Sequence, residues 1–351
     1  MLMIRQNNAS SAFTIVELLV VIVVIGILAA ITIVSYTGIT QRAVISSLQS
    51  DLVSASTQLK IFSIDNSNYP STISTDCAAS PDTNTNKCLK VSNGAAYAYY
   101  VDNTTNNQNF CITATKNNYS YSVNNTGTVV SAAFCPVLYL DAGNTASYPG
   151  TGTAWSDLSG NGNNGTLNGG VIYSGTNGGI LSFDGVNDYA SVASGVNLIQ
   201  NSKYFSMGLL FNMNSLASLR GLMGTLNYGC SANLGLVASG NTLSMYNDTA
   251  TCYNVDLSGW VETNKWLFAV ATYDGVTTKV YGIKDGVLSS ASGSSKSGLT
   301  NTFSSDFRVM GNQSSANFTN GSCQYAVVFN RVISQSEITQ IYNNIKGRYG
   351  F

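Results

Sequence analysis

The sequence has little charge and no histidine. Asp, Glu, Lys and Arg make up 9% of the 351 residues, against about 25% in an average soluble protein. The net charge of −1 excludes a strongly basic surface for the phosphates of nucleic acids. Without histidine, general acid–base catalysis would depend on Asp and Glu alone. Hydrophobic residues still make up 44% of the chain, which is enough to bury a core and argues against a disordered protein.

The cysteines are spaced in a way that argues against a metal site. There are seven, none of them in a C-x-x-C pattern, and a zinc site without histidine would need thiolates alone. Disulfides formed in an oxidising compartment are the better interpretation. Cys323 lies in the strand-like run GSCQYAVVF, and we expect it to be a buried free thiol.

The N-terminal region contains one long apolar run with a single carboxylate. The run extends from Phe13 to Val34, and Glu17 is its only ionisable residue. As a helix these residues would span roughly 33 Å, about the thickness of a hydrocarbon core. A small residue, Ala12, stands before the run and not after it, so cleavage there would keep the helix, unlike cleavage of an ordinary secretory signal.

The stretch AFTIVELL, residues 12–19, resembles the class III signal of type IV prepilins and pseudopilins. The resemblance implies that prepilin peptidase cleaves between Ala12 and Phe13, that Phe13 is then N-methylated, and that Glu17 is the family's assembly acid. An unpaired carboxylate is costly in lipid, and the resemblance implies a partner, the free α-amine of a neighbouring subunit's Phe13. Ala12 replaces the usual Gly, and Val34 stands where many pilins have a kinking Pro. The alternative is a plain membrane anchor in which Glu17 reaches the interface.

The apolar pattern continues beyond the lipid-like run as one face of a helix. Apolar residues recur three to five positions apart, which is helical spacing: Ile39, Val44, Leu48, Leu52, Ala55, Leu59 and Phe62. The run NSNYPS (66–71) ends the pattern, because Pro70 disfavours helix in the residue before it. We therefore expect a long helix over 13–65, with 13–34 as the transmembrane and filament-core part.

A small β head over 66–135 should follow this helix. AYAYYV, NFCITAT and YSYSV are short alternating runs between Asn-rich turns, as in antiparallel strands. By resemblance to pilins, Cys111 and Cys135 would close a C-terminal loop. Cys77 and Cys88 would staple the connection after the helix.

Residues 136–351 carry a second resemblance. The segments AWSDLSGNGNNGTLNGG, LSFDGVNDYASV, KWLFAVATYDG and FNRVISQSEITQIYNNIKGRYG resemble, in this order, LamG-like (concanavalin A-like) jelly-roll domains. Alternating runs between DG and GN turns agree with a two-sheet sandwich. Ser334 and Glu337 form a capping-box pattern before a final short helix. Cys230 and Cys252 are the pair available to cross-link this domain.

Candidate ligand sites in the sandwich are few. Its acids lie mostly in turns and show no E-x-D-x-x-E pattern, so we expect no catalysis. Asp157, Asn161 and Asn163 offer oxygen ligands on a Gly-rich loop and are candidates for Ca²⁺, although turn formation explains the same residues. We expect no other cofactor. Among the tryptophans, Trp266 should be core, and Trp260 is the candidate for stacking on a sugar.

The expected fold is an α+β pilin, with a long N-terminal helix and a small antiparallel sheet, followed by an all-β jelly-roll sandwich. The leader would be 1–12. The expected function is a subunit of a type IV pilus-like filament that displays the LamG-like module for adhesion to an external carbohydrate or protein. Expected partners are copies of itself and other pilins, prepilin peptidase, the inner-membrane assembly platform and the membrane before assembly, and no nucleic acid. The alternatives are a pseudopilin of a type II secretion or DNA-uptake system and, more distantly, a membrane-tethered glycan hydrolase. The expected location is the cytoplasmic membrane, then the cell surface.

Overall fold

The computed structural model describes most of the chain beyond residue 14. The described residues are 15–75, 77, 87–103, 108–117, 119–131, 133–192, 198, 204–216, 219–225, 233–248, 254–294, 306–312 and 317–349; the side chains of residues 17, 30–38, 102, 233, 247, 248 and 294 lie outside this description. The chain divides into two compact units, Met1–Ser47 and Leu48–Phe351.

The long helix α1 comprises Ile15–Asn66 and continues without a break through Val34. Its later turns bury one apolar face in the second unit, formed by Leu48, Leu52, Ala55, Leu59 and Phe62. The helical spacing read from the sequence is therefore confirmed for these residues. Ile39, which belongs to the first unit, is instead 67% exposed.

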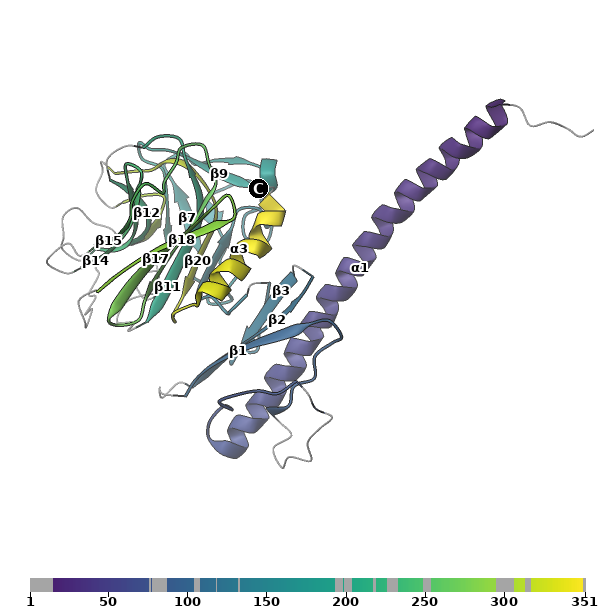
Figure 1. Ribbon diagram of the computed structural model, residues 1–351, viewed down its shortest axis with the longest axis horizontal. Coiled ribbons are helices and arrows are strands. Elements are labelled where there is room, and N and C mark those ends of the chain that lie inside the picture. The colour runs from purple at the N-terminus through teal and green to yellow at the C-terminus, as the bar shows by residue number, and fades with distance from the viewer. Residues whose placement is uncertain are drawn as a thin grey trace, which may run out of the picture. The chain divides into compact units, whose positions relative to one another are not determined.

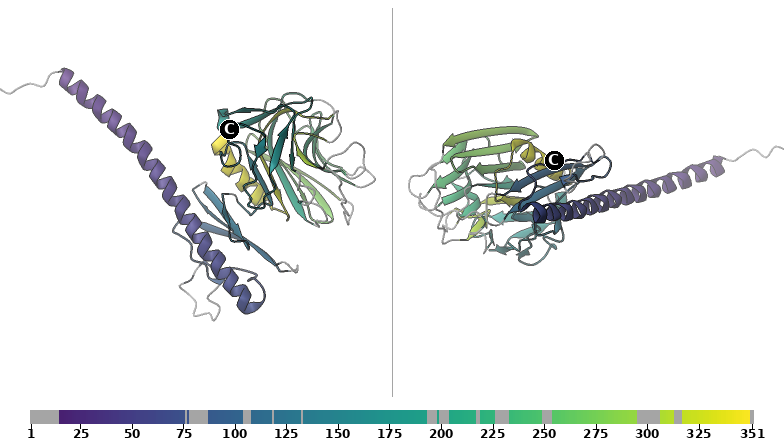
Figure 2. Two further views of the ribbon diagram at one scale, coloured as in Figure 1. Left: turned by 180° about the vertical axis from the view of Figure 1, so that it is seen from behind. Right: turned by 90° about the horizontal axis from the view of Figure 1, so that it is seen from below.

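A four-stranded antiparallel sheet, called the small sheet, follows α1. Its strands are β1 (Ala96–Asp102), β2 (Asn109–Lys116), β3 (Tyr119–Asn124) and β4 (Val129–Val130). It lies along the C-terminal half of α1 (Figures 1 and 2). Phe110, Ile112 and Val123 of this sheet are fully buried, and Asp51 of α1 accepts hydrogen bonds from the backbone N and the hydroxyl of Ser92 before β1. Helix and sheet thus share a small core.

The remainder of the second unit is a sandwich of two antiparallel sheets. The β14 sheet has the order β15 (Asn254–Leu257), β14 (Thr242–Asp248), β13 (Asn233–Ser239), β12 (Arg220–Thr225), β19 (Phe307–Val309), β10 (Tyr189–Val192), β7 (Gly165–Asn168) and β6 (Ala154–Trp155). The β11 sheet has the order β18 (Val287–Ser294), β17 (Thr277–Lys284), β16 (Leu267–Tyr273), β11 (Phe205–Met213), β20 (Asn320–Phe329), β9 (Ile180–Asp184) and β8 (Ile172–Ser174), with β5 (Leu138–Asp141) also paired to β20; η2 (Thr176–Gly178) is a short 3₁₀ turn.

The central strands of the β11 sheet, such as β16 and β11, are buried on both faces. Along β16, Leu267, Ala269 and Ala271 point to the core between the sheets, whereas Phe268 and Val270 belong to a second cluster on the outer face. This division follows the two-residue period of a strand. Both faces are apolar because a helix covers the outer one.

The covering element is the C-terminal helix α3, Gln335–Tyr349. It buries Ile338, Ile341, Tyr342, Ile345 and Tyr349 in the second cluster. Its other side contacts the small sheet, because Gln340 donates to the Thr115 hydroxyl (3.1 Å) and Asn344 to that of Ser120 (2.9 Å). Figure 1 shows α3 between the sandwich and strands β1–β3.

The architecture is therefore a long N-terminal helix with a small antiparallel sheet, followed by an all-β sandwich, as the sequence predicts. The capping box is also present: the backbone N of Ser334 donates to Glu337 Oε2 (2.7 Å), and the N of Glu337 donates back to Ser334 Oγ (3.3 Å). These two reciprocal hydrogen bonds at the start of α3 explain why the helix begins where it does.

Candidate functional site

Of the residues predicted to act in processing and assembly, only the backbone of Glu17 is described, in the first turn of α1. Ala12, Phe13 and the side chain of Glu17 lie outside the described part of the chain. Twelve large apolar side chains between Ile15 and Leu28 are 49–84% exposed. A continuous apolar surface of this kind marks a contact site for lipid or for another protein.

In the part of the chain that the structure describes, no helix is both long enough and apolar enough to span a membrane.

Two disulfides lie in and before the small sheet. Cys77 is bonded to Cys88, and Cys111 of β2 is bonded to Cys135, the two pairings that the resemblance to pilins implied for this region. Cys323 is a fully buried free thiol. The pairing of Cys230 with Cys252 involves residues outside the described ranges.

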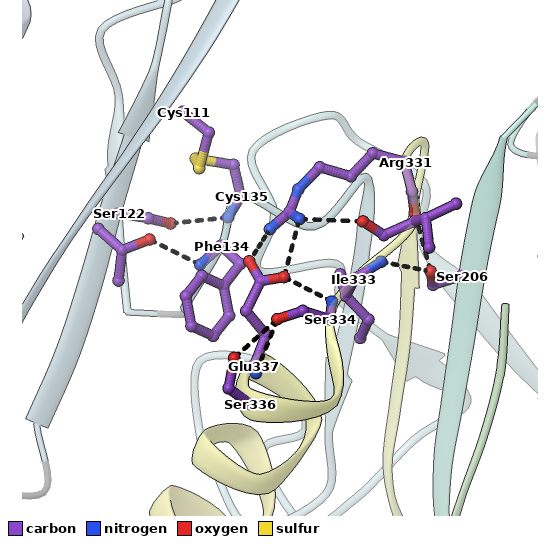
Figure 3. A network of polar contacts seen from close by, with 12 residues as sticks. Cys111, Ser122, Phe134, Cys135, Ser206, Arg331, Ile333, Ser334, Ser336 and Glu337 are labelled. Carbon is purple, nitrogen blue, oxygen red and sulfur yellow. Dashed lines mark hydrogen bonds and ion pairs between the residues drawn. A yellow bond between two sulfur atoms is a disulfide. The ribbon is translucent and has the colours of Figure 1, made fainter. Parts of the chain in front are cut away.

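The segment that joins the small sheet to the sandwich is held in an unusual backbone conformation. Phe134 and Cys135 have φ values of 66° and 48°, in the left-handed region that residues with a Cβ rarely occupy. Two side chains of the small sheet hold this turn: Phe134 N donates to Thr113 Oγ1 (2.8 Å) and Cys135 N to Ser122 Oγ (3.2 Å). Figure 3 shows these bonds beside the disulfide.

Arg331 contacts this joining segment from the sandwich side. Its side chain is 9% exposed, and its Nη2 lies 2.6 Å from Oε1 of Glu337. Its guanidinium lies 5.0 Å from the ring centre of Tyr100 and 5.8 Å from that of Phe134, within the range of cation–π attraction. Figure 3 shows Arg331 between the Phe134 turn and the first turn of α3.

Arg331 was not among the residues for which the sequence predicts a role. The sequence did contain a signal for this contact, because Arg331 stands three residues before the predicted N-cap, Ser334, and six before the acid of the capping box, Glu337. Burial by itself raises the pKa of Glu337, but the hydrogen bonds and charge of Arg331 and the backbone N–H of Ser334 outweigh it and hold that pKa below its ordinary value. The carboxylate is therefore ionised at neutral pH.

The candidate Ca²⁺ residues are gathered in one loop, where Asp157 is the organising acid. Its carboxylate accepts hydrogen bonds from the backbone N of Tyr139, Ser159 and Asn163 and from the Ser159 hydroxyl, at 2.7–2.9 Å. Asn161 and Asn163 donate through Nδ2 to the carbonyl of Val137. These bonds are those of a turn-forming Asp, and Ca²⁺ binding here stays a prediction.

Two of the three tryptophans, Trp260 and Trp266, differ in burial from the sequence interpretation. Trp155 is fully buried and Trp260 is 4% exposed, whereas Trp266 is only partly buried against the outer cluster. Trp260, the candidate for stacking on a sugar, is buried because its ring packs into the core over Gly282. Trp260 lines a pocket of about 210 Å³ with Lys284 and Val287, so its part in ligand binding stays a prediction.

The acidic side chains of the sandwich are characterised by their spacing and their hydrogen-bond partners. The described residues contain no group of three or more Cys, Asp or Glu side chains placed to hold a metal ion. Asp184 and Asp188 are close, but Asp184 accepts from the backbone N of Val186, and Asp188 accepts from the backbone N of Asp184. Burial raises the pKa of Asp188. Both acids act in forming the turn between β9 and β10.

Comparisons with known proteins identify the two ends of the chain. Residues 7–33 match the prokaryotic N-terminal methylation motif, and residues 183–339 match the concanavalin A-like lectin/glucanases superfamily. The type II secretion system core protein G of Aeromonas hydrophila is 36% identical over 67 residues, 19% of this chain and 47% of that protein. That of Dickeya chrysanthemi is 38% identical over 67 residues and 44% of its length. The chain thus spans about half the length of these relatives.

A solved structure similar to the chain is a Trypanosoma rangeli sialidase in complex with 2,3-difluorosialic acid. The TM-score is 0.47 and the sequence identity 16%, over 75% of this chain and 47% of the sialidase. The sequence matches to the methylation motif, to the core protein G relatives and to the concanavalin A-like superfamily show that the chain combines a pilin- or pseudopilin-type N-terminal segment with a concanavalin A-like β-sandwich.

Proposed function

We propose that this chain is a structural subunit of a type IV pilus-like extracellular filament that displays its sandwich outward. The observation that carries the proposal is the methylation motif over 7–33 at the start of a continuous helix with exposed apolar side chains from Ile15 to Leu28. Such a helix needs an apolar environment. The membrane supplies it before assembly, and neighbouring subunits supply it in the fibre.

In this proposal the chain is processed and assembled as prepilins are. Prepilin peptidase removes residues 1–12, the new terminal residue Phe13 is methylated, and the assembly platform of the cytoplasmic membrane adds the subunit to the fibre. Glu17 pairs with the α-amine of a neighbouring Phe13, since a carboxylate buried among apolar helices requires a partner. The helix 13–65 and the head 66–135 form the pilin part, and 136–351 the displayed module.

The proposal is tested with Glu17→Ala and Glu17→Asp. Glu17→Ala should give a processed, membrane-inserted monomer that enters sheared filaments at least about tenfold less than wild type, because a buried ion pair is lost. Glu17→Asp keeps the charge and should retain part of the assembly. Measurements are the N-terminal mass, membrane fractionation and negative-stain micrographs of sheared material. Normal filaments from Glu17→Ala would contradict the role of Glu17 in register.

A second candidate is a pseudopilin of a secretion system, and the core protein G relatives favour it. Deleting this chain would then abolish the export of folded enzymes, whereas loss of a surface fibre alone would favour the first candidate. The filament proposal also includes adhesion, in which the sandwich binds an external carbohydrate or protein. It further proposes that the sandwich has no catalytic activity, and hydrolysis of a polysaccharide by the purified chain would contradict this.

We also propose that one loop of the sandwich binds Ca²⁺ through Asp157, Asn161 and Asn163. Titration of the chain with Ca²⁺ should raise its melting temperature, because a ligand that binds only the folded state stabilises it. Asp157→Asn should abolish the increase. An increase that is unchanged in this variant would place Ca²⁺ elsewhere.

A further inference from the structure

A small pocket lies where the small sheet meets the sandwich, and both parts form its walls. Its volume is about 150 Å³, and its lining includes Tyr100, Asn109, Asn124, Asn161, Asn330 and Arg331. The first three belong to the small sheet and the last three to the sandwich. The volume corresponds to about five water molecules and is below the roughly 300 Å³ of a pocket for a drug-sized ligand. It suits one small polar molecule.

The chemistry of the lining is neutral and rich in amides. Five asparagines line the pocket, and none of its lining residues is an Asp or a Glu. Arg331 is its one charged residue, and Glu337 balances this charge from outside the lining. A side-chain amide offers both donors and an acceptor, which is the pattern that hydroxyl groups match. A metal ion or a multiply charged anion would find no matching charge.

Two polar atoms of the lining residues are left without hydrogen-bond partners in the described chain. They are Nε of Arg331, a donor, and Oδ1 of Asn109, an acceptor, and both atoms are buried. Folded proteins rarely leave buried polar atoms unpaired, because desolvation without a partner costs free energy. A hydroxyl group can accept a hydrogen bond from the first kind of atom and donate one to the second.

The pocket wall is also rigid. Phe134 and Cys135 line it with left-handed backbone angles, and the disulfide to Cys111 fixes the same turn. Residues held in sparsely populated conformations persist where the surrounding structure determines them, and they are often found at ligand sites. A preformed wall lowers the cost of ordering a bound molecule.

Tyr100 provides an aromatic surface at the rim. Its side chain is 41% exposed, and the guanidinium of Arg331 lies 5.0 Å from its ring centre. A tyrosine ring presents apolar area with a polar tip, which complements a sugar ring with its apolar C–H face and its hydroxyl edge. We propose that this junction pocket binds one ring of a neutral saccharide.

The test uses the full chain, purified in an amine-oxide detergent so that no glycosidic detergent competes. Saturation-transfer NMR and calorimetry are run with methyl glycosides of glucose, galactose, mannose and N-acetylglucosamine. We expect at least one to bind at millimolar concentration. Tyr100→Ala and Asn330→Ala should each weaken that binding by about tenfold, since each removes one contact of the ring.

Tyr204→Ala is the matched control, because Tyr204 is 52% exposed on the sandwich and is not among the lining residues. It should leave binding unchanged, and circular dichroism should show that all three variants fold. Absence of binding by every glycoside would overturn the proposal. So would binding that survives both pocket variants, which would place the sugar elsewhere, or binding of sodium sulfate in preference to the glycosides. The assay needs only monomer, so these outcomes leave the filament proposal intact.

Discussion

Arg331 and Glu337 form a two-point ion pair at the start of the last helix. Nη2 of Arg331 lies 2.6 Å from Oε1 of Glu337, and its Nη1 lies 3.2 Å from Oε2. The same carboxylate caps α3 by accepting from Ser334 N, and the same guanidinium stacks near Phe134 of the joining segment. One ion pair therefore connects the cap of α3 to the segment that joins the small sheet to the sandwich.

Glu337→Gln should destabilise the chain in a pH-dependent manner. The pKa of Glu337 is lowered in the folded state from its ordinary value of 4.5, so the ionised form stabilises the fold above that value. This contribution is lost as the pH falls through the folded pKa. At pH 7 the variant should lose about 3 kcal/mol. In melting curves from pH 7 to pH 3, the difference between wild type and variant should shrink below about pH 4.5.

Asp65→Asn is the control for this experiment, because Asp65 is an exposed carboxylate on α1. It should change the melting temperature little at any pH. If the two variants had the same pH profile, the contribution of the Arg331 ion pair to stability would be refuted.

Asp141 should anchor the C-terminal end of α3. It is fully buried, it pairs with Arg348 (2.6 Å), and it accepts from the hydroxyls of Tyr139 (2.9 Å) and Tyr349 (2.6 Å). Burial, reinforced by the charge of Asp141, raises the pKa of both tyrosines, which remain donors. Asp141→Asn should cost about 3 kcal/mol in urea unfolding.

Hydrogen exchange should locate this effect in the last turns of α3. Arg348→Met leaves the buried carboxylate without its cation, so the double variant Asp141→Asn/Arg348→Met should lose less than the sum of the two single losses. Additive losses would mean that the two residues do not act as a pair.

Gly282 on β17 should tolerate no side chain. A Cβ at this position would overlap the ring of Trp260, so Gly282→Ala should destabilise the sandwich by about 1–3 kcal/mol. Gly347 in α3 is the control position, where the same substitution should change the stability in the opposite direction, because a Cβ there meets no atom within 4 Å. Gly347→Ala should stabilise by about 0.5–1 kcal/mol. Equal melting temperatures for the two variants would contradict the packing of Trp260.

Cys323 should resist alkylation in the folded protein. Its side chain is 0% exposed, and burial raises the pKa of its thiol, so the reactive thiolate is scarce. Peptide mapping after treatment with iodoacetamide should find Cys323 unmodified in the native chain and modified after unfolding in guanidinium. Rapid native labelling would mean that β20 opens readily.

The periodic elements of this chain could be predicted from the sequence because they depend on neighbours in the chain. Leu48, Leu52 and Leu59 repeat with helical spacing and are buried on one face of α1. Ser334 and Glu337 lie three residues apart and form the capping box that their spacing predicts. Such patterns are local.

Residues whose environment depends on distant segments could not be assigned in this way. Trp266 was expected in the core and is only partly buried, whereas Trp260 is buried, because α3 and Gly282 decide which faces are covered. Ile39 continues the apolar pattern of α1 and is nevertheless exposed. Burial depends on what packs against a residue, which is not a property of its neighbours in the sequence.

The sequence by itself determined the helix–sheet–sandwich order and the methylation motif, because spacing and residue type are sufficient for both. Only the tertiary structure decided that Arg331 meets Tyr100 and Phe134 at one pocket. These residues are brought together because α3 packs with one side on the sandwich and with the other on the small sheet. Long-range packing of this kind minimises exposed apolar area over the whole unit, and no short stretch of sequence records its outcome.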